Sequence, residues 1–341
     1  MPRSDTTIGY NVVAPDNFTV LRKGIHGGNL YEMAAEGAVY EHLPYLMDMH
    51  GTRYQHGFDA GYTQVDMMQY TYQTFLASVL HPAGPFEPAV QYIVELFLDW
   101  QWKDYLSKQV PAEYIEESKG LHDGCLQALN DTSWGRQFQN NDSFVNCDTL
   151  WNRVQVLANL PGSIGDLKYV LANEFNISLT DGQIDETWLE TSVNNSPVGQ
   201  KAKFVGENLY MLLTRKLKAI QPAQCSMIAA WGSRSNDSQL YSGRNLDWLE
   251  NTGANRYKAI YVFHPKGKNP HVTVGYAGLL GALTGMSSRG LTVHEANLEE
   301  SPETFFGFPW LLRLRNVMEN CDNLESAKKL WENTNNTVGF K

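Results

Sequence analysis

Cys225 begins a short apolar segment, and two charged residues, Arg244 and Asp247, follow about twenty residues later. A β-hairpin between the two segments would bring these charges near the cysteine. Residues 225–231 are apolar or small, residues 232–237 have the composition of a turn, and strand-like character then returns. Pairing of these two strands would bring Arg244 and Asp247 back beside the cysteine. The pattern therefore predicts an arginine and an aspartate facing a thiol.

These three side chains suit nucleophilic catalysis by a thiolate. Arg244 stays charged at any relevant pH and would favour the thiolate form of Cys225, whereas Asp247 could orient an amine or imidazole that acts as a base. Spacing alone favours a structural interpretation, in which Cys225 is a small buried side chain and the charged pair lies on the surface.

A thiol nucleophile also needs a general base, and no histidine stands out for this role. The histidines downstream of the cysteine carry no protease signature; they are His264, His271 and His294. Cleavage of the peptide bond after Gln224 would instead give Cys225 a free α-amino group, and that amine can serve as the base. From the residues alone, this amine is the one candidate base that needs no histidine.

Four motifs in this part of the chain resemble a known superfamily. They are Cys-Ser at 225–226, Gly-Arg-Asn-Leu-Asp-Trp at 243–248, Gly-Tyr-Ala-Gly at 275–278 and Leu-Thr-Val-His-Glu at 291–295. Together they resemble the N-terminal-nucleophile hydrolases of the acid ceramidase, N-acylethanolamine acid amidase, choloylglycine hydrolase and acyl-CoA:6-aminopenicillanic acid acyltransferase superfamily. The resemblance covers residues 222–300 well and residues 50–61 weakly.

The resemblance implies an αββα sandwich, self-cleavage before Cys225 and hydrolysis of amide-linked acyl groups in an acidic compartment. It makes Cys225 the nucleophile and its freed amine the base, with Arg244 and Asp247 beside them. Glu295 matches a family glutamate near the nucleophile, and Asn297 is a weaker catalytic candidate. Members of this superfamily also use a distal oxyanion-hole asparagine that has no match before the chain ends, so we expect the C-terminal part of the catalytic domain to be missing.

Large aromatic side chains near these motifs are candidates for a pocket that binds the acyl group. The predicted substrate-binding residues are Trp231, Trp248, Phe305 and Phe306, with Phe308 and Trp310 as further candidates. Ordinary core packing is the alternative for all of them, and it is the commoner role of large aromatic residues. Thiol and amine chemistry needs no cofactor, and the cysteines show no metal-ligand spacing, so neither a cofactor nor a metal is expected.

Cysteines and glycosylation sequons indicate a secreted or lysosomal protein. Cys125 and Cys147 could close a short disulfide loop in an oxidising compartment, which leaves Cys321 without a visible partner. Seven asparagines lie in acceptor sequons, although an Asn-rich chain makes some by chance; they are Asn17, Asn130, Asn141, Asn176, Asn194, Asn236 and Asn335. No signal peptide begins the sequence.

Composition excludes several partners. The chain of 341 residues carries 27 Lys and Arg against 37 Asp and Glu, a net charge of -10, which argues against nucleic acid and anionic membranes. No apolar run reaches the length of a membrane span. The expected partner is therefore an acylated small molecule or lipid, together with the association of the two chains that cleavage would produce.

Helical patterns dominate before Cys225 and strand patterns follow it, which predicts an α+β chain. We expect a mostly helical segment over residues 1–224 and the start of the catalytic domain over residues 225–341. Within the first segment, Gly57 and Gly61 share a helical face on which another element could approach closely. His50 and His56 are possible ligands, but no carboxylate cluster accompanies them, so a merely polar role is favoured.

The sequence thus predicts a cysteine amidohydrolase that cleaves a ceramide-like lipid or an N-acyl amine through a thioester at Cys225. A first alternative is an acyltransferase that passes the acyl group to an amine. The remaining alternatives are a phospholipase-B-like lipase and a non-catalytic lipid-binding relative.

Overall fold

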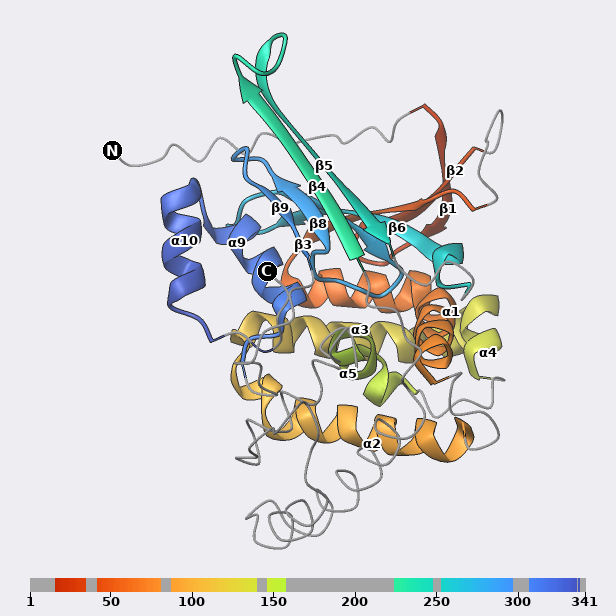
Figure 1. Cartoon of the computed structure of the whole chain (residues 1–341). Helices are drawn as coiled ribbons and strands as arrows, with labels where there is room; N and C mark the ends of the chain where they lie inside the picture. Colours follow the sequence, from red (N-terminus) through yellow and green to blue (C-terminus); the bar gives the residue numbers. More distant parts are fainter. Residues whose placement is uncertain are drawn as a thin grey trace, which may run out of the picture.

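The computed structural model combines helices with two sheets, as the sequence predicts (Figure 1). It describes residues 16–34, 42–80, 87–139, 146–157, 224–247, 253–296, 307–335 and 337. The α+β class is therefore confirmed, and the specific αββα sandwich stays a prediction. No helix in these ranges is both long and apolar enough to cross a membrane.

The larger sheet joins strands from both sides of the predicted cleavage site. Its order is β1-β2-β3-β6-β7-β8-β9, and every neighbouring pair is antiparallel except β3 with β6, which run parallel. The strands are β1 Phe18–Lys23, β2 Asn29–Met33, β3 Tyr45–Gly51, β6 Lys258–Pro265, β7 His271–Tyr276, β8 Thr284–Ser287 and β9 Thr292–His294. Cleavage before Cys225 would consequently leave two chains that share one ladder of backbone hydrogen bonds between β3 and β6.

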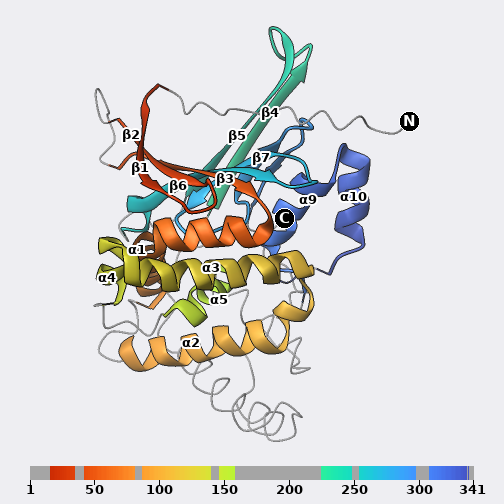
Figure 2. The ribbon, with the colours of Figure 1, turned by 180° about the vertical axis from the view of Figure 1, so that it is seen from behind.

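In the described ranges, five helices lie in layers beneath this sheet, with α1 against it, α3 below α1 and α2 farthest away (Figures 1 and 2). They are α1 Arg53–Leu80, α2 Glu87–Asp104, α3 Ala112–Asp131, α4 Ser133–Gln139 and α5 Cys147–Leu157. Two further helices follow the strands, α9 Trp310–Asn320 and α10 Leu324–Glu332, and two short 3-10 helices span Leu106–Lys108 and Ala254–Tyr257.

Close packing of α1 on α3 confirms the glycine face predicted from the sequence. A Cβ added at Gly57 would lie 1.9 Å from the carbonyl oxygen of Glu117, and one at Gly61 would lie 2.2 Å from that of Leu121. Gly120 and Gly124 on α3 face α1 in the same way. The two backbones are therefore in direct contact, which only glycine permits at these positions.

The core below the sheet contains both apolar side chains and a disulfide. Met47 of β3 and Phe263 of β6 are fully buried in one cluster with residues of α1 and α3. Cys125 and Cys147 form a disulfide that ties α3 to α5, as predicted, with Cα atoms 5.6 Å apart. Cys225 and Cys321 are free thiols.

A buried network of charges joins α9 to the helices that precede the predicted cleavage site. Arg315 donates two hydrogen bonds to Glu117 of α3, at 2.8 and 2.7 Å, and one to Glu319 at 2.8 Å. Arg53 of α1 pairs with the same Glu319. Because Glu117, Arg315 and Glu319 are fully buried, each charge depends on its partners for stability.

Candidate active site at Cys225

The predicted hairpin around Cys225 is present and forms a separate two-stranded sheet. Strand β4 spans Gln224–Gly232 and β5 spans Ser238–Asp247, and the pair projects from the body of the molecule (Figures 1 and 2). Cys225 lies opposite Leu246, whose side chain packs against a buried cluster around Trp310. The base of the hairpin, where the cysteine lies, is thus fixed to the core.

Arg244 lies directly beside the thiol. It is paired with Met227, so it falls two positions from the residue opposite Cys225 and on the same face of the hairpin. Its Nη2 donates to the sulfur of Cys225 at 3.2 Å. The prediction that the returning strand brings this arginine to the cysteine is confirmed by the geometry.

Glu295 is the second partner of Arg244, and it comes from the larger sheet. It follows β9, and its backbone N–H donates to the carbonyl of Leu283 at 3.0 Å. Its carboxylate pairs with the Nη2 that also contacts the sulfur. Only 3% of the Arg244 side chain and 2% of the Glu295 side chain are exposed, so the thiol and a carboxylate share one buried positive charge.

Burial and the guanidinium together perturb the titratable groups around this site. Burial raises the pKa of Glu295 to about 7, although the charge of Arg244 acts to lower it. Burial and then Arg244 lower the pKa of His294, while burial raises that of Tyr276 against the effect of Arg244. Near neutral pH, Glu295 therefore exchanges a proton readily and His294 stays neutral.

Two buried polar atoms of the site make no hydrogen bond in the described part of the chain, Nε of Arg244 and Nε2 of His294. Among the described residues, the sulfur of Cys225 accepts a hydrogen bond from Arg244, and no histidine is hydrogen-bonded to it. The arrangement can therefore hold the sulfur in place and offer a further N–H to an oxygen.

Other predicted site residues have different placements. The backbone of Asp247 pairs with that of Gln224, and nothing is described of either side chain. Trp231 is 63% exposed, six residues and about 20 Å along β4 from the cysteine. Phe308 and Trp310 are buried in the core, while Trp248, Asn297, Phe305 and Phe306 lie outside the described residues.

Four sequon asparagines are described and all are exposed: Asn17, Asn130, Asn236 and Asn335. The remaining three, Asn141, Asn176 and Asn194, lie outside the described residues. Tyr276 and His294 are site neighbours that sequence reasoning did not select. Both belong to the recognised motifs 275–278 and 291–295, which was the available signal.

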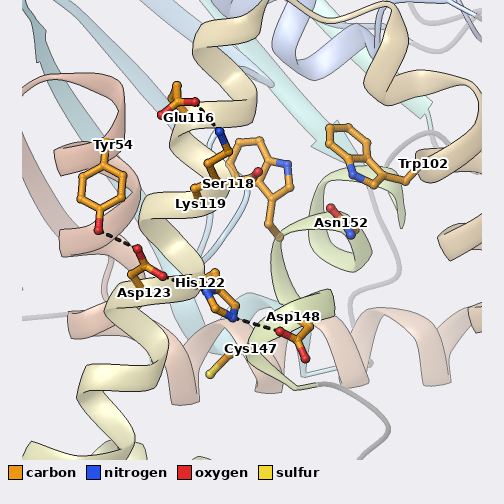
Figure 3. A pocket seen from close by; sticks show the side chains of 11 residues that line it. Tyr54, Trp102, Glu116, Ser118, Lys119, His122, Asp123, Cys147, Asp148 and Asn152 are labelled. Atoms are coloured by element: carbon orange, nitrogen blue, oxygen red, sulfur yellow. Dashed lines mark hydrogen bonds and ion pairs between the residues drawn. The ribbon is translucent and has the colours of Figure 1, made fainter.

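A second polar site lies among the helices, in a pocket of about 500 Å³ between α1, α2, α3 and α5 (Figure 3). His122 lies between Asp123 and Asp148, with each ring nitrogen 2.9 Å from a carboxylate oxygen. The hydroxyl of Ser118 donates to a backbone carbonyl at 2.8 Å. The histidine is thus engaged with two carboxylates and the hydroxyl with a backbone carbonyl, so these contacts do not join them as a base and a nucleophile.

Comparison with known families concerns the part of the chain that follows Cys225. Residues 233–341 match the family model described as acyl-coenzyme A:6-aminopenicillanic acid acyl-transferase. This part of the chain is therefore similar to that family, which agrees with the superfamily resemblance of the motifs and suggests acyl-transfer or hydrolase chemistry of the N-terminal-nucleophile type. It includes Arg244 and Glu295 but begins after Cys225, so the assignment of the nucleophile depends on the hairpin geometry. Comparison with curated proteins gave no significant match.

Proposed function

We propose that the chain is a self-cleaving cysteine amidohydrolase that removes an amide-linked acyl group from an N-acyl amine or a ceramide-like lipid. The observation that carries the proposal is the 3.2 Å contact between Arg244 and the sulfur of Cys225, at the base of a hairpin that begins at Gln224. The contact fixes the sulfur of Cys225 beside the Gln224–Cys225 peptide bond, which this sulfur would attack.

Self-cleavage begins with attack of the Cys225 sulfur on the carbonyl carbon of Gln224. The C–N bond breaks, the nitrogen takes the proton of the thiol, and water then hydrolyses the resulting thioester. The products are a carboxylate at Gln224 and a free α-amine at Cys225. That amine is the base of the mature enzyme, which accounts for the lack of a histidine at the sulfur among the described residues.

Substrate hydrolysis repeats the same chemistry. The amine of Cys225 accepts the thiol proton, the sulfur attacks the amide carbonyl, and the leaving nitrogen receives that proton. Water, deprotonated by the amine, then converts the thioester into a carboxylic acid. The unpartnered Nε–H of Arg244 is suited to stabilise the oxyanion of either step, and a donor of this kind contributes on the order of 3 kcal/mol.

The test compares two free thiols of the same chain. A Cys225→Ala variant should lose hydrolysis of N-acyl amine substrates and acyl-thioester formation detected by mass spectrometry. A Cys321→Ala variant is the matched control, since Cys321 is a free thiol packed near α9 and α10, and it should retain both. Turnover of N-acyl substrates by Cys225→Ala would overturn the proposal.

Acyl transfer to an amine is the second candidate, because the matched family is described as an acyl-transferase. The two functions differ in the fate of the thioester. Added amine acceptor should accelerate its turnover and yield an amide product if the enzyme is a transferase, whereas a hydrolase releases the free acid. An intact chain with no acylation of Cys225 would instead favour a non-catalytic lipid-binding protein, and ester hydrolysis without amide hydrolysis would favour a lipase.

We further propose that the protein is lysosomal or secreted and that its two chains remain associated. The disulfide and the four exposed sequon asparagines support an oxidising compartment. The β3–β6 ladder and the bonds of Arg315 to Glu117 would connect the chains after cleavage. The disulfide lies within the first chain and both thiols of the second are free, so denaturing electrophoresis should separate the chains without reductant.

A further inference from the structure

Two histidines and an aspartate converge where β3 and β6 end. The parallel register pairs His50 of β3 with His264 of β6, so their side chains leave the sheet on the same face. Their rings stack with centroids 4.5 Å apart and planes 3° from parallel. Asp48 lies two residues before His50 and therefore shares that face.

The carboxylate of Asp48 connects the two rings. One of its oxygens lies 2.8 Å from Nε2 of His50, and the other lies 3.1 Å from Nε2 of His264. The contact with His264 lacks hydrogen-bond geometry, so Oδ1 of Asp48 and Nε2 of His264 are buried polar atoms without a hydrogen bond in the described residues. Such atoms are costly unless a cation or a proton joins them.

Burial and charge at this cluster also suit a cation. Asp48 is 4% exposed, whereas 37% of the His50 side chain is open to solvent, so the cluster has a buried base and one accessible side. Asp59 lies near enough to His50 to act on it electrostatically and adds negative charge. The three donor atoms lie within 4.8 Å of one another.

We propose that Asp48, His50 and His264 form a binding site for a divalent transition-metal ion, with Zn²⁺ as the best match. Two imidazole nitrogens and one carboxylate oxygen are typical zinc ligands, and the exposed side leaves room for water as a fourth. Tetrahedral coordination requires metal–ligand distances near 2.0 to 2.2 Å, which this cluster reaches with small side-chain movements.

The site is separate from the reaction centre. The strand register places His294, next to Glu295, level with Ile260 of β6. His264 lies four residues farther along that strand, about 13 Å away in the strand direction, and β6 and β9 are three strands apart. The metal therefore takes no part in the reaction at Cys225. Its ligands come from both sides of the cleavage site, so in the mature enzyme it would clamp the two chains together, a consequence that depends on the proposed cleavage.

Zinc binding is best measured in the full chain carrying Cys225→Ala. This substitution removes a thiol that could compete for zinc, and it keeps the protein as a single uncleaved chain. After treatment with chelator and dialysis, calorimetric titration with Zn²⁺ should show one site per chain. Adding His50→Gln or His264→Gln should weaken binding more than tenfold. His122→Gln is the matched control, since His122 also lies between two carboxylates, and it should bind zinc as the parent does.

Circular dichroism of the metal-free variants verifies their folding. If His264→Gln does not fold, His50→Gln alone carries the test, because the side chain of His50 is partly exposed. Absence of a zinc site in the parent, or equal affinity in His50→Gln, would overturn the proposal. The clamp has its own test in the processed enzyme, where Zn²⁺ should raise the urea concentration at which the chains separate. Failure of cleavage would remove that test but leave the zinc titration intact, so the two failures are distinguishable.

Discussion

Replacing Arg244 by Met would leave the carboxylate of Glu295 buried without its counter-ion. The two side chains are 3% and 2% exposed, and breaking a buried ion pair from one side costs about 3–5 kcal/mol. Protonation of Glu295 relieves this cost, and its pKa is already raised to about 7 by burial. The loss should therefore be large at pH 8 and much smaller at pH 5.

The assay is urea unfolding of the intact Cys225→Ala chain with and without Arg244→Met, at both pH values. Adding Glu295→Gln to Arg244→Met removes the stranded charge and should recover most of the lost stability. Arg289→Met is the matched control, because its pair with Asp322 is exposed on both sides and should cost at most about 1 kcal/mol. A loss in Arg244→Met no larger than in Arg289→Met, or one independent of pH, would refute this reasoning.

Three further predictions concern stability. Gly57→Ala should destabilise by about 1–3 kcal/mol despite better helix propensity, because the methyl group would lie 1.9 Å from a backbone oxygen of α3; equal or higher stability in urea would contradict the packing. Replacing Cys125 and Cys147 together by Ser should cost about 3 kcal/mol, since the disulfide closes a 22-residue separation, and a melting temperature unaffected by the change would contradict this. Glu295 has a folded pKa of about 7 against an ordinary 4.5, so the neutral carboxyl stabilises the fold below pH 4.5 and this contribution disappears as the pH rises through 7. The free energy of unfolding of the parent should then fall by about 3 kcal/mol from pH 4.5 to pH 8, relative to that of a Glu295→Gln variant. The same pH dependence of unfolding in both proteins would contradict the raised pKa of Glu295.

Features set by neighbouring residues could be predicted from the sequence. The hairpin joins segments separated by a short turn, so its register and the approach of Arg244 to Cys225 follow from local patterns. The glycine face of α1 follows in the same way from helical periodicity. The disulfide could be predicted because the chain has four cysteines, and Cys125 and Cys147 lie only 22 residues apart.

Long-range pairings could not be predicted. Strand β3 contains the buried run 46–49, which periodicity does not distinguish from a buried helix, and its partner β6 lies more than 200 residues away. We considered His50 a possible ligand but found no carboxylate cluster, because the parallel register that adds His264 to Asp48 is invisible in sequence. The local pattern places Arg244 and Asp247 beside Cys225, whereas Glu295, the residue that pairs with Arg244, is indicated only by the family resemblance.

The central claim is that Cys225 becomes both the nucleophile and the N-terminal residue of a second chain. Intact-mass measurement with N-terminal sequencing after incubation at acidic pH tests it most directly. The account predicts two fragments, residues 1–224 and a second chain that begins at Cys225, in the parent and in Cys321→Ala, but a single uncleaved chain in Cys225→Ala. A Cys225→Ala protein that still yields a fragment beginning at position 225, or a parent that stays whole while hydrolysing N-acyl amines, would contradict it.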